Sequence, residues 1–193
     1  MNEANRKPFR GLLSALLLTV ALASCALVIG GEAPPLRPVE AVDLERYAGE
    51  WHVIANIPYF LERGNVAART RYRLREDGRL DDVYLYREAF GDPLRRMEGV
   101  ARLVEGSGGA RWEVQFVWPM WFDYVIIALD DDYRTAAIAH PSRDYGWILA
   151  REPRIDEADY ERLLEAFSAQ GYDPERFLKV PQFPGQQGRP GFQ

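Results

Sequence analysis

A run of period-two alternation is the feature that most restricts the fold of this chain. Between residues 68 and 75, four arginines alternate with Ala68, Thr70, Tyr72 and Leu74. Successive side chains of a β-strand point to opposite faces, so the pattern predicts a strand with one wet face and one buried face. A helix would spread the arginines around its circumference. The segment therefore indicates a sheet that meets solvent on one side only.

Seven other segments also have the residue pattern of β-strands. Turn sequences such as Asp77-Gly78 and the glycine-rich residues 106–109 separate several of them. An antiparallel meander of eight strands can close on itself, which removes its unpaired edges. We therefore expect an all-β fold, an eight-stranded antiparallel up-and-down barrel over residues 41–182. The expected strands begin near Trp51 and then cover residues 68–75, 80–87, 97–105, 110–118, 124–129, 135–140 and 145–151.

The periodicity changes once, after Pro153. Asp156 is placed to cap a helix, and Gly171 is placed to end it. The apolar side chains between them recur at helical spacing: Tyr160, Leu163, Leu164 and Phe167. We expect one α-helix here, packed on the outside of the barrel. The last segment, residues 183–193, is rich in Gly, Pro and Gln, and this composition predicts disorder.

The N-terminus is expected to be a disposable leader. Residues 11–31 contain no charged residue, and Arg6, Lys7 and Arg10 precede them, which is the order of a bacterial export signal. Leu22-Ala23-Ser24-Cys25 resembles the lipobox of bacterial lipoproteins. This resemblance implies that residues 1–24 are cleaved and that Cys25 is acylated. Two or more acyl chains anchor a protein stably. The same resemblance implies sorting to the outer membrane, because the residue after the cysteine is Ala26 rather than Asp.

An uncleaved membrane helix is the alternative for this leader, because a span needs about 20 apolar residues. In either case residues 25–40 form an N-terminal tether, in which Pro34, Pro35 and Pro38 favour an extended, stiff chain.

Charge and cysteine content argue against a nucleic-acid-binding protein and against a fold held by internal disulfides. The first 24 residues hold three basic residues and one acidic residue, so the rest of the chain carries 21 basic and 28 acidic ones. Such an acidic body lacks the basic surface that nucleic acid requires, and we expect no nucleic-acid partner. A single cysteine also excludes an internal disulfide.

The residues resemble the lipocalin family, in particular its bacterial outer-membrane lipoprotein branch. The resemblance covers about residues 40–182 and rests on Gly49-Glu50-Trp51 at the first strand, Asp131-Asp132-Tyr133 between the sixth and seventh strands, and Arg151 at the end of the eighth. It implies that Gly49, Trp51, Asp131, Tyr133 and Arg151 hold the fold, with Trp51 closing one end of the barrel. Arg151 would stack on the indole of Trp51.

The resemblance also implies a ligand, because members of that branch are associated with fatty acids and lysophospholipids. An eight-stranded barrel can hold one small ligand or be filled by side chains, and a filled core is the alternative here. Small residues beside aromatic ones favour a cavity suited to an acyl chain. By alternation, the expected pocket residues are Val53, Ala55, Ala68, Thr70, Tyr72, Leu74, Ala101, Leu103, Val114, Phe116, Trp147 and Leu149.

Two points about this interior stay open. In the third strand, either Val83 and Leu85 or Asp82, Tyr84 and Tyr86 could face inward, and an inward Asp82 would make the pocket more polar than a fatty acid requires.

Residues 58–61 and 118–122 are apolar where turns are usually polar. They could contact a membrane or a protein, or they could close a lid over the pocket.

Nothing in the sequence indicates an enzyme. The two histidines, His52 and His140, stand in no recognisable catalytic spacing, and no phosphate-binding glycine loop is present. We expect no cofactor and no metal, since the three acidic residues at 130–132 are typical of a solvated hairpin. The expected function is that of a membrane-anchored lipid carrier at the cell envelope, its domain facing the periplasm and a homodimer left open. The alternatives are a protein-interaction module docking through the apolar loops and a lipocalin-fold enzyme acting on a lipid.

Overall fold

The computed structural model describes residues 33–193, of which residues 35–193 form one compact unit. The expected signal peptide at residues 1–24 and the expected acylation site Cys25 lie outside the described residues. No helix within residues 33–193 is both long and apolar enough to cross a membrane.

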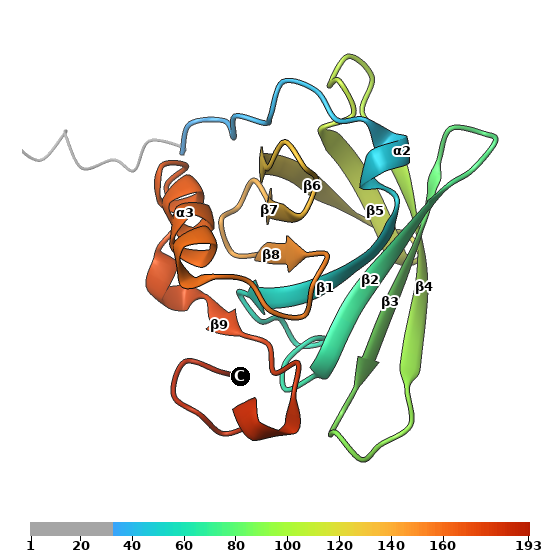
Figure 1. Cartoon of the computed structure of the whole chain (residues 1–193). Helices are drawn as coiled ribbons and strands as arrows, with labels where there is room; N and C mark the ends of the chain where they lie inside the picture. The colour runs from blue at the N-terminus through green and yellow to red at the C-terminus, as the bar shows by residue number, and fades with distance from the viewer. Residues whose placement is uncertain (1–32) are drawn as a thin grey trace, which may run out of the picture. The chain divides into compact units, whose positions relative to one another are not determined.

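Eight strands follow one another along the chain, as the alternation predicts, and each pairs antiparallel with the next (Figure 1). The first strand pairs with the eighth as well as with the second. This pairing closes the barrel and confirms the expected fold class. Short β-bulges interrupt several pairs and shift the alternation locally. The strands are β1 (Gly49–Asn56), β2 (Val66–Leu74), β3 (Leu80–Arg87), β4 (Arg95–Leu103), β5 (Arg111–Val117), β6 (Met120–Leu129), β7 (Thr135–Ala139) and β8 (Gly146–Ala150).

A ninth strand, β9 (Leu178–Lys179), which the sequence did not indicate, pairs with the end of β1. The chain after it continues between β1 and β2: the backbone N–H of Ala67 donates to the carbonyl of Pro181 at 2.7 Å. The side-chain amide of Gln182 donates to the carbonyl of Val53 on β1 at 2.8 Å and to that of Ala68 on β2 at 3.2 Å. This late segment therefore completes the barrel wall where β1 and β2 no longer pair directly.

The expected helix is α3 (Glu157–Ser168), which packs outside the barrel against β6 and β7 (Figure 1). Its buried side chains are Tyr160, Leu163 and Phe167, on one face. Asp156 stands at the N-cap with extended backbone, but its side chain makes no capping hydrogen bond. The helix ends before Gly171, whose positive φ of 84° leads the chain away from the helix axis.

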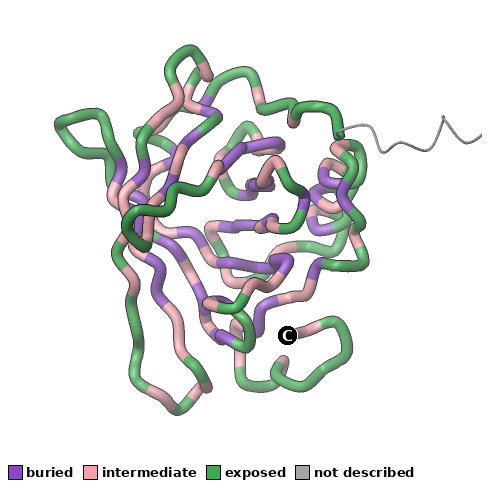
Figure 2. The backbone as a smooth tube through the Cα atoms, turned by 180° about the vertical axis from the view of Figure 1, so that it is seen from behind, coloured by how far each residue is buried: buried purple, intermediate pink, exposed green. Residues whose placement is uncertain are grey.

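The apolar residues form two clusters, one inside the barrel and one between the barrel wall and α3. The inner cluster contains Trp51 and Trp112, and the outer cluster contains Leu163 and Phe167. Figure 2 shows buried residues along the strands and exposed residues at the hairpin tips. The strands that face α3 are therefore buried on both sides, which explains why residues 124–129 and 135–139 read as nearly continuous apolar runs.

The segment before the barrel is fastened to it earlier than a tether up to residue 40 would suggest. The backbone N–H of Arg37 donates to the side-chain oxygen of Gln170, just beyond the end of α3, at 3.0 Å, and the side-chain nitrogen of Gln170 donates to the carbonyl of Arg37 at 2.9 Å. The N–H of Val39 donates to the carbonyl of Ile126 at 2.9 Å. A short helix, α2 (Leu44–Tyr47), follows and is capped by the side chain of Asp43. It lies at one end of the barrel (Figure 1).

The C-terminal segment differs from the expectation of disorder over residues 183–193. It contains a 3-10 turn at Pro184–Gln186, after another at Pro174–Arg176, and then returns to form a parallel bridge between Phe192 and Lys179. The side chain of Gln193 donates to Asn56 on β1 at 3.2 Å. The composition, rich in Gly, Pro and Gln, predicted disorder, but the backbone and side-chain amide groups of the segment form hydrogen bonds with β1 and β9.

Candidate functional site

The barrel encloses a cavity of about 510 Å³ that opens at the end opposite α2. Its size lies within the range of small-molecule sites, and most of its wall is apolar or aromatic. Side chains reach it from the β1–β2 loop, from six of the strands and from the β7–β8 turn. The lining residues are Val53, Tyr59, Phe60, Leu61, Glu62, Thr70, Tyr72, Asp82, Tyr84, Val114, Phe116, Val117, Met120, Phe122, Asp123, Tyr124, Tyr145, Trp147 and Leu149.

Packed aromatic rings close the floor of this cavity. Tyr124 stacks on Trp112, with ring centroids 5.1 Å apart, and Tyr72 meets Trp112 edge to face at 5.2 Å. The hydroxyls of Tyr72 and Tyr124 are hydrogen-bonded at 2.6 Å, so these buried polar ends satisfy one another. Below them, Tyr47 packs on Trp51 at 4.9 Å. The closed end is thus a plug of several rings rather than Trp51 alone.

Arg151 lies over the indole of Trp51, with its guanidinium carbon 3.9 Å from the ring centroid. Its nitrogens also donate to backbone carbonyls in three neighbouring segments, among them Glu50 at 2.9 Å and Tyr133 at 3.2 Å. Gly49 has a positive φ of 103°, and a Cβ built there would come within 3.1 Å of the guanidinium. The glycine, the tryptophan and the arginine therefore form one structural unit at the closed end.

Asp131 and Tyr133 lie in the same region. The Tyr133 hydroxyl accepts a hydrogen bond from the backbone N–H of Asp43 at 2.8 Å. The guanidinium of Arg46 lies over the Tyr133 ring at 4.0 Å and donates to the carbonyl of Asp131 at 2.7 Å. These contacts fasten α2 to the β6–β7 turn, well away from the cavity.

Glu62 is the first of two buried acidic side chains in the cavity wall, with 6% of its surface exposed. Its Oε2 accepts hydrogen bonds from Asn56 Nδ2 at 2.7 Å and Trp147 Nε1 at 2.8 Å. Burial raises the pKa of Glu62 to about 7, although the two hydrogen bonds lower it in part. The side chain comes from the β1–β2 loop, which folds back over the interior.

Asp82 is the second acidic residue, with 3% of its surface exposed, and the hydroxyl of Thr70 donates to it. Burial raises the pKa of Asp82 to about 7, against the lowering effect of that hydrogen bond. Leu80, Asp82 and Tyr84 thus form the inner face of the third strand, which the sequence left open. The pocket is more polar than its apolar rim suggests.

Of the twelve expected pocket residues, the structure brings seven to the cavity: Val53, Thr70, Tyr72, Val114, Phe116, Trp147 and Leu149. Ala55 lies on the other side of the wall, in the cluster beneath α3. The reason is the β-bulge between Val53 and Ala55, which shifts the alternation by one residue. Asn56, rather than Ala55, therefore reaches toward Glu62 inside the barrel.

The other four do not touch the cavity. Ala68 and Ala101 are fully buried in the inner cluster, but their short side chains do not reach the space. Leu103 packs against the inner cluster, paired with Trp112. Leu74, at the β2–β3 hairpin, is 37% exposed. Alternation gives the face of a residue but not its depth in the barrel.

The mouth of the cavity is apolar and partly exposed. Phe60 lines the cavity yet is 82% exposed, and Trp118 is 83% exposed. Most of residues 118–122, expected as a loop, belong to a strand: β6 begins at Met120, and a tight hairpin with a cis Trp118–Pro119 bond joins it to β5. The apolar character of these residues was the only sequence signal for their place at the rim.

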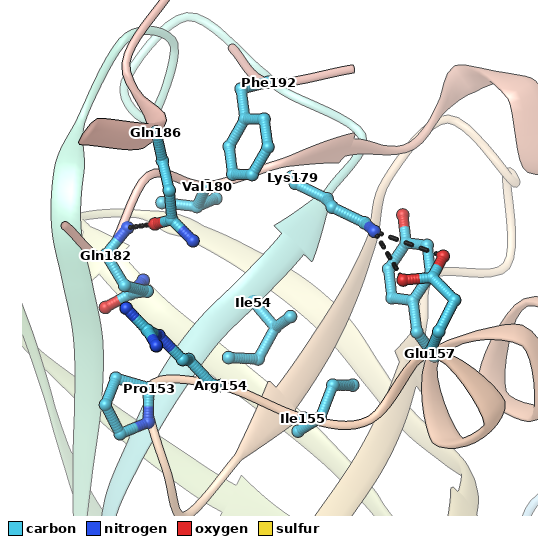
Figure 3. A pocket seen from close by; sticks show the side chains of 11 residues that line it. Ile54, Pro153, Arg154, Ile155, Glu157, Lys179, Val180, Gln182, Gln186 and Phe192 are labelled. Carbon is cyan, nitrogen blue, oxygen red and sulfur yellow. Dashed lines mark hydrogen bonds and ion pairs between the residues drawn. The ribbon is translucent and has the colours of Figure 1, made fainter. Parts of the chain in front are cut away.

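A second hollow, of about 210 Å³, lies outside the barrel beside β9 and the start of α3 (Figure 3). Its charged side chains already have partners: Lys179 is paired with Glu157 at 3.1 Å, and Arg154 covers the ring of Phe183 at 4.2 Å. The barrel cavity is larger and better enclosed by apolar side chains, so we take it as the functional site.

Within residues 33–193, no group of three or more His, Cys, Asp or Glu side chains is arranged to hold a metal ion. Asp130 accepts the backbone N–H groups of Arg134 and Thr135, which turns it toward the hairpin itself. His52 lies 3.3 Å from Gln182, and His140 lies 2.9 Å from Ser142. Neither histidine lines the cavity.

A family model described as a lipocalin-like domain matches residues 42–182. Outer membrane lipoprotein Blc of Escherichia coli K12 is 33% identical over 172 residues, covering 86% of this chain and 97% of that protein. Temperature-induced lipocalin-1 of Arabidopsis thaliana is 32% identical over 161 residues, covering 78% and 85%. Among solved structures, insecticyanin from the tobacco hornworm Manduca sexta has a TM-score of 0.62 at 19% identity, covering 78% of this chain and 86% of that one.

Proposed function

Because the chain belongs to the lipocalin family, we propose that it binds the acyl chain of a fatty acid or lysophospholipid in its barrel and stores or carries this lipid at the bacterial cell envelope. The observation that supports this most directly is the cavity of about 510 Å³, closed at one end by packed rings and open at the other. Burying an apolar chain there removes it from water, at about 25 cal/mol per Å² of apolar surface.

The envelope location rests on sequence and relatives together. Four relatives of this chain, from three bacterial genera, are named as outer membrane lipoproteins. The leader of this chain ends at Ser24, and the lipobox-like Leu22-Ala23-Ser24-Cys25 would make acylated Cys25 the anchor of the mature protein. The proposed arrangement is a lipid-anchored domain on the outer membrane that faces the periplasm.

Native mass spectrometry of the full chain after gentle extraction tests the ligand. We expect a bound single-chain lipid that is lost in the variant Val114→Phe, because the larger side chain fills the cavity. The matched control is Gln115→Val on the same strand, since Gln115 does not line the cavity. A chain that never carries lipid, or a Val114→Phe variant that carries as much as the wild type, would contradict the proposal.

The exposed apolar rim favours a second candidate, a module that docks on another protein. Phe60 and Trp118 present most of their surface to solvent, and exposed apolar patches often mark contact sites. The same spectra separate the two functions, because a lipid-free homodimer or other complex that dissociates in a Trp118→Ser variant would support docking instead.

A further inference from the structure

The carboxyl groups of Glu62 and Asp82 lie in the wall of one cavity, and neutral side chains donate hydrogen bonds to only one oxygen of each. Both hydrogen bonds to Glu62 go to Oε2, and the hydrogen bond to Asp82 goes to Oδ1. The other oxygen of each carboxyl accepts no hydrogen bond from a side chain or backbone group in residues 33–193. Neither oxygen is enclosed by protein atoms, so a partner from outside the chain can reach it, and a buried charge is costly unless it is paired.

Nothing in the cavity wall offers a positive charge. The lining residues include no Lys, Arg or His within the described part of the chain. The two acids act on each other, and the other titratable groups near them are neutral tyrosines: Tyr47 on α2, Tyr59 on the loop of Glu62, Tyr72 on β2 and Tyr84 on β3. Asp123 on β6 adds a third carboxyl to the lining. A ligand carboxylate inside this cavity would meet charges of its own sign only.

Glu62 also lies among aromatic rings at the mouth. Tyr59 meets Tyr145 edge to face at 5.7 Å and Trp147 at 6.5 Å, and Trp147 donates directly to Glu62. The faces of such rings attract cations, including quaternary ammonium groups. A carboxylate in this aromatic surrounding therefore attracts an ammonium group and repels a carboxylate.

We propose that the polar end of the ligand is an ammonium group held at Glu62, with Tyr59, Tyr145 and Trp147 around it and the apolar chain in the barrel. This inference rests on the proposed function, because it assumes that the cavity holds a single-chain amphiphile. Of the two lipid classes named above, only a lysophospholipid can supply an ammonium group, with its phosphate directed away from Glu62, and a free fatty acid supplies only a charge of the same sign as Glu62.

Protonation of the site supports this selection. Burial holds the pKa of Glu62 and that of Asp82 at about 7, so both acids lose their protons as the pH rises above neutrality. An ammonium ligand then gains its counter-ion, whereas an anionic ligand gains a repulsion. Affinity for the cation should increase with pH, and affinity for a neutral chain should not change.

The experiment compares three ligands that share one dodecyl chain: dodecyltrimethylammonium, dodecanoate and dodecanol. Each displaces a neutral naphthylamine probe from the full chain, held in a nonionic amphipol so that no lipid competes. At about pH 8.5 we expect the ammonium to bind about tenfold more tightly than dodecanoate, and Glu62→Gln to remove most of that preference. Dodecanol should bind both proteins alike. The control Glu161→Gln removes an exposed charge from α3 and should retain the preference.

The wild-type chain supplies a measurement that needs no variant. Between about pH 8.5 and about pH 5.5, ammonium affinity should fall while dodecanol affinity stays constant. Dodecanoate binding at least as tightly as the ammonium at the higher pH would overturn the inference, as would an equal loss of dodecanol and ammonium in Glu62→Gln. If none of the three ligands displaces a bound probe, the proposed function fails with it, which distinguishes the two failures.

Discussion

Replacing Glu62 by glutamine should stabilise the ligand-free protein at alkaline pH. The glutamine is isosteric, and its carbonyl oxygen can accept the same two hydrogen bonds from Asn56 and Trp147. What the substitution removes is a charge that the fold buries. Since burial raises the pKa of Glu62 from 4.5 to about 7, the unfolded chain releases this proton more readily than the folded one.

The sign and size of the effect follow from that difference. Below about pH 4.5 the side chain is neutral in both states, and wild type and variant should be equally stable. As the pH rises toward 7, ionisation favours the unfolded wild-type chain, and above 7 the loss is complete. It amounts to about 3 kcal/mol at most, because water in the cavity reduces the cost of burying the charge. For a domain of this size that is a shift of about 6 to 12 °C in Tm.

Thermal unfolding followed by circular dichroism at about pH 4 and about pH 8.5 checks this prediction. The control is again Glu161→Gln, which changes the same charge on an exposed helix face and should alter stability by less than about 0.5 kcal/mol at either pH. If Glu62→Gln unfolds at the same temperature as the wild type at alkaline pH, or at a lower one, the buried carboxylate does not cost what its position implies.

Three further substitutions test the parts of the fold that surround the site. Arg151→Ala should lower stability by about 3 kcal/mol in urea unfolding, through lost hydrogen bonds and the lost contact with Trp51, while ligand affinity changes little; Arg63→Ala, an exposed control, should change neither. Gly49→Ala should cost about 1 to 3 kcal/mol because of its positive φ, and an unchanged Tm would contradict the proposed packing against Arg151. Gln182→Ala should cost about 1 to 2 kcal/mol and speed hydrogen exchange at the β1–β2 edge, which an unaltered exchange pattern would disprove.

Local sequence patterns determined the order of the elements with little ambiguity. The turn at Asp77-Gly78 and the alternation on both sides of it predict β2 and β3 within two residues of their observed limits. The change from period two to helical spacing places α3 correctly as well. These signals depend on neighbours in the chain, and one buried face is enough to produce them.

Local patterns do not predict the depth of a side chain in the barrel or the register of a strand, because both depend on how the strands pair. Ala55 was placed inward by alternation, but a β-bulge in β1 turns it toward α3. Ala68 and Ala101 were placed on the correct side of the wall and yet lie away from the cavity. The inner face of the third strand is decided by the tertiary structure, in which Thr70 on β2 donates a hydrogen bond to the buried Asp82 on β3.

The sequence alone thus determined that the chain forms a barrel with a helix outside it, since periodicity and turn chemistry are local properties. Only the tertiary structure decided what the barrel can hold. Glu62 lies in an irregular loop, and it becomes a cavity residue through a hydrogen bond to Trp147, 85 positions away. The closing segment at Gln182 likewise depends on partners more than 110 positions distant. No local pattern encodes such contacts, because they exist only once the strands have closed around them.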